Sequence, residues 1–199
     1  KKVEENNFGI RKRLLEYDDV MNKQRNVVYK KRNHALFGER LALDLDNSFY
    51  SVANGLILSF KELNNHDEFK LAAIVNFGID TSITPEELDK DDANVLSERL
   101  YYEAVTQYRH KTDKMVQQTL PIIKNIRKEQ GDHIENVSVP FTDGKKLIHA
   151  LANLDKYLAT EGRELNDALE RNITLALIDD AWKEHLRAMD DLRQSVQTA

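Results

Sequence analysis

Four pairs of adjacent aspartates are the side chains in this sequence whose type could support catalysis. Where two carboxyl groups catalyse a hydrolysis together, they must converge on one bond, one as the acid and the other as the base or nucleophile. Neighbouring residues on a helix point about 100° apart and do not face each other. We therefore interpret these aspartates as helix caps or exposed charge. The pairs are Asp18-Asp19, Asp91-Asp92, Asp179-Asp180 and Asp190-Asp191.

The six histidines are the other candidates, because imidazole serves both as a general base and as a metal ligand. None has a second histidine three or four residues away, the spacing that builds a metal-binding face on a helix. The sequence also lacks a phosphate-binding loop and the GxGxxG, GxSxG and HExxH motifs. We therefore predict no catalytic, cofactor or metal site here. The histidines are His34, His66, His110, His133, His149 and His185.

Composition argues against several other classes of protein. The 199 residues are 41% hydrophobic, enough to bury a core, and contain no cysteine for disulfides or thiolate metal sites. A net charge of -5 disfavours a dedicated nucleic-acid-binding protein, which needs a surplus of Lys and Arg to contact phosphates. The first residue is Lys rather than Met, and no run of about 18 apolar residues occurs. We expect a piece of a larger soluble protein.

Heptad-like spacing predicts a helix from Val3 to about Leu36, about 50 Å long. Gln24 occupies one polar position in its main apolar row. A second apolar row predicts contacts on more than one side of the helix. We interpret the basic residues that crowd this helix as a solvated or interdomain face, with phosphate or acidic lipid as the alternative. The main row is Ile10, Leu14, Tyr17, Met21 and Val28, and the second is Leu15, Val20 and Val27.

Helices also dominate the middle of the sequence. A second helix is predicted from Asp44, with Asp46, Asn47 and Ser48 as candidate caps. An apolar stretch over residues 69–77 follows and stops at Gly78. The sequence Thr84-Pro85-Glu86-Glu87 combines a capping box with proline at the first helical position and predicts a short helix.

A long helix is predicted from Asp91 to about Gln130, kinked or interrupted at Pro121 and ended by Gly131. Residues 134–148 are β-prone around an Asp143-Gly144 turn and predict at most one small hairpin. Helical periodicity returns by Leu151, breaks near Gly162 and continues to Val196. The predicted fold class is mainly α.

The last helix carries the single tryptophan, Trp182, beside Ile178, Leu186 and Met189. We interpret Trp182 as an aromatic anchor against a neighbouring helix, with a moving interface as the alternative. Spacings of four and three residues suggest that Asp179 pairs with Lys183 and Arg187 with Asp190.

Two motifs in the terminal segments carry a family resemblance. One is NFGIRK at residues 7–12 with LLEYDDVMN at 14–22, and the other is DDAWKEHL at 179–186 with MD and LRQ after it. In these motifs the sequence resembles the bacterial SecA preprotein translocase ATPase, in its helical scaffold and helical wing region. The middle is similar only loosely, and residues 121–162 look longer than the usual wing. The order of the motifs also agrees with the family.

The resemblance implies a division into domains: residues 1–40 as the long scaffold helix, 41–163 as the helical wing, and 164–199 as the first helix of a two-helix finger. The tip and return helix of the finger would follow Ala199. The parent chain would bind ATP and Mg²⁺ on two motor domains outside this segment and drive preproteins through the SecYEG channel. It would be cytoplasmic and peripheral at the plasma membrane. The segment itself would have no ATPase activity.

The resemblance also suggests which residues contact other parts of the parent chain. The candidates for interdomain or partner contacts are Tyr17, Asp18, Asp19, Gln24, Arg25, Trp182 and Met189. Trp182 would pack the finger helix on the scaffold helix. A single finger helix would expose its seam, which predicts self-association through Trp182, Met189 and Val196. Two alternatives remain open: a free-standing helical protein–protein interaction module, and a nucleic-acid accessory module using the basic first helix.

Overall fold

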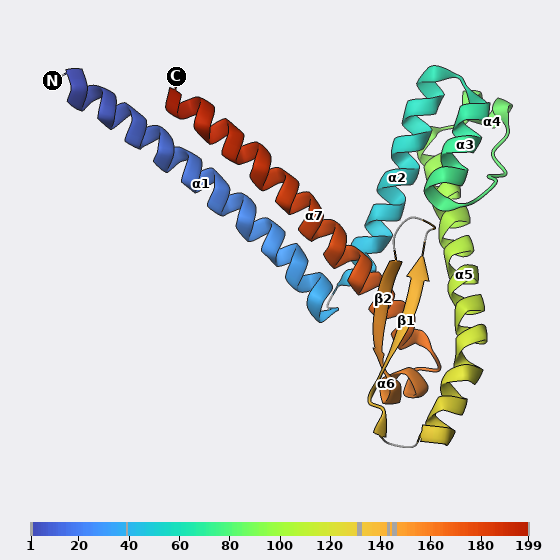
Figure 1. Cartoon of the computed structure of the whole chain (residues 1–199). Coiled ribbons are helices and arrows are strands. Elements are labelled where there is room, and N and C mark those ends of the chain that lie inside the picture. The colour runs from blue at the N-terminus through green and yellow to red at the C-terminus, as the bar shows by residue number, and fades with distance from the viewer. Residues whose placement is uncertain (1, 39, 131–132, 143, 145–146, 199) are drawn as a thin grey trace. The chain divides into compact units, whose positions relative to one another are not determined.

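The computed structural model describes residues 2–38, 40–130, 133–142, 144 and 147–198, without the side chains at 2, 3, 5, 6, 130 and 196–198. Helices α1 to α7 and a two-stranded sheet follow one another along these residues (Figure 1). The predicted mainly α class with one small hairpin is confirmed. No described helix is long and apolar enough to cross a membrane.

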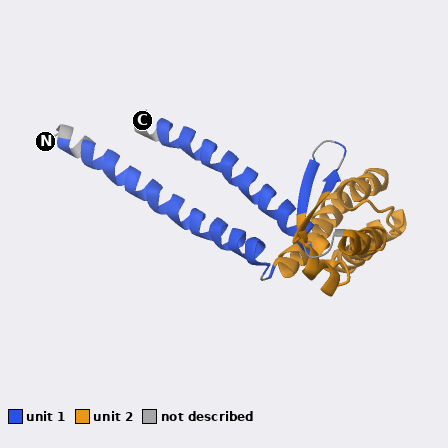
Figure 2. Ribbon diagram, turned by 60° about the horizontal axis from the view of Figure 1, so that its bottom comes forward, with its two compact units in different colours: residues 1–40, 140–150, 167–199 blue, residues 41–139, 151–166 orange. Residues whose placement is uncertain are grey.

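The chain forms two compact units, drawn in different colours in Figure 2. Unit 1 comprises residues 1–40, 140–150 and 167–199, and unit 2 comprises residues 41–139 and 151–166. The boundary therefore passes through the hairpin and through the start of the last helix. The three domains expected from the family resemblance stay a prediction.

Unit 2 is built around helices α2 (Leu41–Leu63), α3 (His66–Phe77), α4 (Pro85–Lys90) and α5 (Ala93–Gln130). Helix α2 packs along α5, and α3 and α4 cover the same end of the pair. Their apolar faces form one core whose side chains are almost completely removed from water. Its largest members are Phe69, Ile57, Ile83, Leu88, Leu96 and Leu100.

Local signals in the sequence position these helices. Asn65 caps α3 by accepting a hydrogen bond from the Glu68 amide, and Gly78 ends α3 with a φ of 67°. Thr84 and Glu87 form the predicted capping box of α4. The predicted short helix is confirmed. It begins here because these local hydrogen bonds satisfy the amides at its start.

Two predictions about helix boundaries in this region are wrong. Asp46, Asn47 and Ser48 are not caps, because α2 already begins at Leu41, directly after Arg40 with its positive φ of 76°. The three polar residues lie on an exposed helical face, where the Ser48 hydroxyl donates to the Asp44 carbonyl at 2.7 Å.

The interruption predicted at Pro121 is wrong, because α5 continues from Ala93 to Gln130, whereas the alternative of a kink stays a prediction. Proline removes one backbone donor, and the carbonyl four residues earlier belongs to the exposed Gln117, which water can reach. The predicted helix end at Gly131 lies outside the described residues.

The predicted hairpin consists of β1 (Asn136–Thr142) and β2 (Leu147–Asn153). Side-chain burial alternates along β1, as expected for a strand with one covered face. The predicted return of helical structure by Leu151 is wrong, because Leu151 and Ala152 still belong to β2. Their side chains continue the alternation of exposed and buried positions along the strand. Asp143 of the predicted turn lies outside the described residues, and Gly144 has a φ of 87°.

Helix α6 (Leu154–Ala159) starts on Asn153, whose side chain accepts from the Lys156 amide. Gly162 then separates α6 from α7 (Arg163–Thr198), which confirms the predicted break. Gly162 has a φ of 95°, and a Cβ atom there would lie 2.6 Å from the Val116 side chain. Glycine is therefore required by both conformation and space.

Candidate functional site

The two predicted motifs lie opposite each other on α1 (Lys2–Phe37) and α7, which belong to unit 1 for most of their length. Polar contacts at three positions of the described residues join the helices. The Tyr17 hydroxyl donates to the Met189 carbonyl at 3.0 Å, and Gln24 Oε1 lies 2.8 Å from His185 Nε2. The third is the ion pair between Arg32 and Asp179. Partner numbers fall on α7 as they rise on α1, so the helices run antiparallel.

The ion pair has the geometry of a two-point contact. Arg32 Nε lies 2.9 Å from Asp179 Oδ1, and Arg32 Nη2 lies 3.4 Å from Oδ2. The hydrogen bond from Arg32 lowers the pKa of Asp179, and the Arg32 and Lys183 charges lower it further. Asp179 raises the pKa of Arg32 in turn. A guanidinium fork that meets both carboxylate oxygens fixes the register of the two helices as well as holding them together.

The predicted same-helix ion pairs are wrong. Asp179 pairs with Arg32 across the seam, while Lys183 lies 3.5 Å from Asp180. Arg187 pairs with Glu184 at 2.7 Å. Asp179 favours Arg32 because the guanidinium contacts both of its oxygens, which a lysine cannot match with one ammonium group.

The main apolar row of α1 faces this seam. Met21 is the most buried of its members, with 6% of its surface exposed. Ile10, Leu14 and Val28 are half-buried. The second row, Leu15, Val20 and Val27, is exposed, and only Val27 of the three lines a pocket shared with α7, so the second contact side predicted for this helix stays a prediction.

Four of the seven predicted contact residues lie together along this seam. Tyr17 and Gln24 come from α1, and Trp182 and Met189 come from α7. The Trp182 ring is half-buried and stacks on the His185 ring, with centroids 5.3 Å apart. These placements position the residues, and their roles in contacts with other domains stay predictions.

The structure does not bring the other three predicted residues to the seam. Asp18, Asp19 and Arg25 are exposed on α1, and Arg25 donates to Asn22 on the same helix at 3.5 Å. Val196, predicted for self-association, has a side chain outside the described residues. Sequence analysis missed the roles of Arg32 and His185. Arg32 and Asp179 carry opposite charges and accompany the apolar rows of α1 and α7, and this pattern could have indicated that they pair.

A groove lies between the two helices, which we call the α1–α7 groove. It has a volume of about 590 Å³ and is lined mainly by apolar atoms. Its walls include Lys23, Val27 and Lys31 from α1 and Ile178, Trp182 and His185 from α7.

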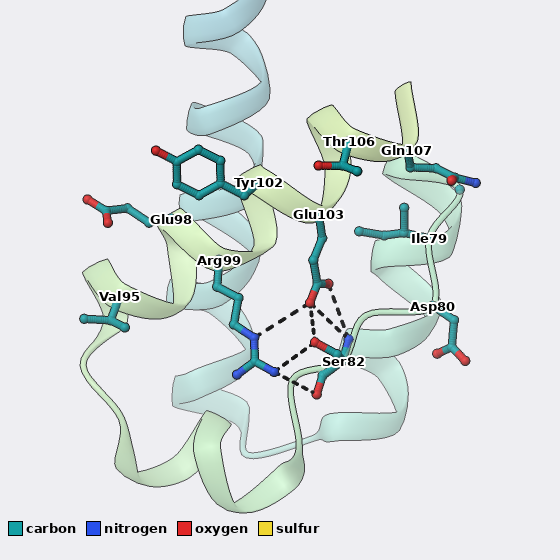
Figure 3. A pocket seen from close by; sticks show the side chains of 11 residues that line it. Ile79, Asp80, Ser82, Val95, Glu98, Arg99, Tyr102, Glu103, Thr106 and Gln107 are labelled. Carbon is teal, nitrogen blue, oxygen red and sulfur yellow. Dashed lines mark hydrogen bonds and ion pairs between the residues drawn. The ribbon is translucent and has the colours of Figure 1, made fainter. Parts of the chain in front are cut away.

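A second pocket lies in unit 2, between the loop after α3 and helix α5, with a volume of about 830 Å³ (Figure 3). Arg99 is its centre: it donates to Glu87 at 2.8 Å and to the Ser82 hydroxyl at 2.8 Å. The Glu103 carboxylate accepts hydrogen bonds from the Ser82 amide and hydroxyl. This network attaches the loop to α5.

Glu87, the partner of Arg99 beside this pocket, is held in its charged form. A backbone hydrogen bond at Thr84, followed by the Arg99 hydrogen bond, lowers the pKa of Glu87 to about 2. A carboxylate so occupied is a structural acceptor rather than a proton donor near neutral pH. Within the described residues, no three His, Cys, Asp or Glu side chains are grouped as a metal site.

Comparison with known proteins assigns the chain to a family. The family model described as "SecA Wing and Scaffold domain" matches residues 1–199. The chain is 47% identical to "Protein translocase subunit SecA" of Christiangramia forsetii, 46% to that of Cytophaga hutchinsonii and 44% to that of Parabacteroides distasonis. Each match covers 100% of this chain and 18% of the relative.

No solved structure matches the chain. The chain spans about 18% of the length of the curated relatives that it matches. Because the family model covers every residue, including both seam motifs, the chain belongs to the SecA wing and scaffold domain family.

Proposed function

We propose that this chain is the scaffold and wing segment of a protein-translocating ATPase that moves preproteins through the SecYEG channel. In this proposal α1 is a strut that contacts the motor domains of the parent chain. Helix α7 is the first helix of a two-helix finger directed toward the channel. The observation that carries the proposal is the family match over residues 1–199, with relatives named as the SecA subunit of the protein translocase.

The geometry of the α1–α7 seam supports a role in coupling. Contacts at Tyr17, Gln24 and Arg32 are separated by seven and eight residues, about two turns each, so they hold the helices along about 22 Å. An apolar row between these contacts resists sliding of one helix past the other. A displacement of α1 by the motor would therefore move α7 with it.

The proposal assigns no chemistry to this segment. ATP and Mg²⁺ would bind the motor domains elsewhere in the parent chain, and the segment would have no ATPase activity by itself. Its partners would be those motor domains, the channel and the preprotein. The parent protein would act in the cytoplasm, peripherally at the inner face of the plasma membrane.

A segment replacement tests the proposal. The corresponding segment of the Christiangramia forsetii SecA subunit would be exchanged for residues 1–199, and ATP-dependent preprotein import into SecYEG vesicles would be measured. We expect import well above that of the subunit with the segment deleted. A replaced subunit that folds and hydrolyses ATP but imports no preprotein would contradict the proposal.

A further inference from the structure

The α1–α7 groove combines an apolar floor with positive charge on one rim. Val27 has an apolar side chain, yet 59% of its surface is exposed. Trp182 and Ile178 line the same groove from α7. Lys23, Val27 and Lys31 are four residues apart, so they form one stripe along α1. The two lysines are separated by about 12 Å along the helix axis.

The lysines on this rim have no ionic partner in the part of the chain that the structure describes. Both are exposed, and no ion pair joins Lys23 or Lys31 to another residue in the described ranges. Arg32, the next basic residue, is by contrast held by Asp179. The groove therefore presents two positive charges beside exposed apolar surface, a combination that attracts a ligand with the opposite pattern.

We propose that the α1–α7 groove binds an amphipathic helix of a protein partner that carries acidic residues about two turns apart. An apolar helical stripe would fill the floor at Val27 and Trp182, as in other helix-in-groove complexes. Carboxylates seven or eight residues apart on that helix would lie about 11–12 Å apart and would match the spacing of Lys23 and Lys31. The groove volume of about 590 Å³ accommodates several such side chains.

Trp182 makes the proposal directly measurable, because it is the only tryptophan in the chain and lines the groove. The probe is a synthetic peptide of about 18 residues, long enough to form a helix in water. It has leucines along one face, glutamates at two flanking positions seven residues apart, and no tryptophan. We expect a saturable change in Trp182 emission when this peptide is added to the 199-residue chain.

Reversing the charge of the two rim lysines distinguishes specific docking from nonspecific hydrophobic binding. In the double variant Lys23→Glu and Lys31→Glu we expect affinity for the glutamate peptide to fall about tenfold or more, since both rim charges would then repel it. The same variant should gain affinity for a peptide with lysines at the two flanking positions. The matched control is Lys114→Glu with Lys124→Glu, two exposed lysines of α5 whose reversal changes net charge equally.

Three outcomes would overturn the proposal. One is no emission change with the glutamate peptide, and another is equal binding of the lysine peptide by the unchanged chain. The third is a dimer seen by sedimentation in which Val27→Glu restores the monomer, because the groove would then be covered by a second copy. Circular dichroism of each variant confirms that the exposed substitutions leave the helices intact.

Discussion

Units 1 and 2 show two different ways of holding helices together. In unit 2, four helices surround a core that includes Ile57, Phe69 and Leu100, each with 0% of its surface exposed. In unit 1, α1 and α7 share one seam, where the main apolar row is largely half-buried and polar contacts define the register. Unit 2 buries its apolar side chains in one core, whereas the single seam of unit 1 leaves apolar surface for other contacts.

The largest expected effect is the loss of a core side chain in unit 2. Leu100→Ala should lower the free energy of unfolding by about 2–5 kcal/mol, because it removes buried methyl groups and leaves a cavity. Leu14→Ala at the half-buried seam should cost clearly less. Urea unfolding followed by circular dichroism compares the two variants, and equal losses would remove the distinction between the units.

Gly162→Ala should have the next largest effect. Its φ of 95° and the approach of 2.6 Å to Val116 should together cost about 1–3 kcal/mol. The control is Gly55→Ala in helix α2, where nothing lies within 4 Å and alanine should stabilise the helix by about 0.5–1 kcal/mol. The thermal unfolding midpoints of the two variants should therefore shift in opposite directions, and an unchanged or raised midpoint for Gly162→Ala would refute this account of Gly162.

Acid should weaken unit 2 through Glu87 in a defined pH window. Its pKa of about 2 lies below the ordinary value of 4.5, so its stabilising effect is complete above about pH 4.5 and is lost as the pH falls toward 2. Glu87→Gln should lower the unfolding midpoint at neutral pH, and the difference from the unchanged chain should shrink across this window. If the difference in unfolding midpoint between Glu87→Gln and the unchanged chain were the same at pH 4.5 and near pH 2, this would contradict the cause assigned to the lowered pKa of Glu87.

The smallest expected effect is at the seam ion pair of unit 1. Arg32 and Asp179 are each 39% exposed, so solvent screens their attraction and either single substitution to Ala should shift the midpoint only slightly. A double-mutant cycle should still find coupling, because the two-point contact needs both partners. The lowered pKa of Asp179 means that this coupling persists above its ordinary pKa and disappears as acid protonates the carboxyl group. If the effects of the two substitutions on the free energy of unfolding simply added at neutral pH, this would argue against the contact.

Patterns within one element predicted much of this fold. The row through Leu14, Tyr17 and Met21 predicted α1 and the face it buries, and the capping box at Thr84 predicted α4. The start of α2 was missed, since Asp46 and Ser48 have cap chemistry but lie on an exposed helical face. Such polar residues have the same local pattern in both settings, and only the tertiary position distinguishes them.

The candidate site was predictable only in part, for a related reason. Trp182 and Tyr17 were identified by residue type and by their place in apolar rows. The Arg32–Asp179 pair was missed because it depends on the register of two helices 147 residues apart in the sequence. Spacing along one helix indicated Lys183 instead, and such spacing contains no information about a second helix.

The central claim is that the α1–α7 seam couples the motor to the finger, and it can be tested in the segment-replaced SecA subunit. Tyr17→Phe, Gln24→Ala and Arg32→Ala together would remove the polar contacts that set the register, with Lys124→Ala on exposed α5 surface as the control. The measurement is preprotein imported per ATP hydrolysed. We predict that this ratio falls severalfold while ATP hydrolysis continues, and an unchanged ratio in the folded triple variant would contradict the claim.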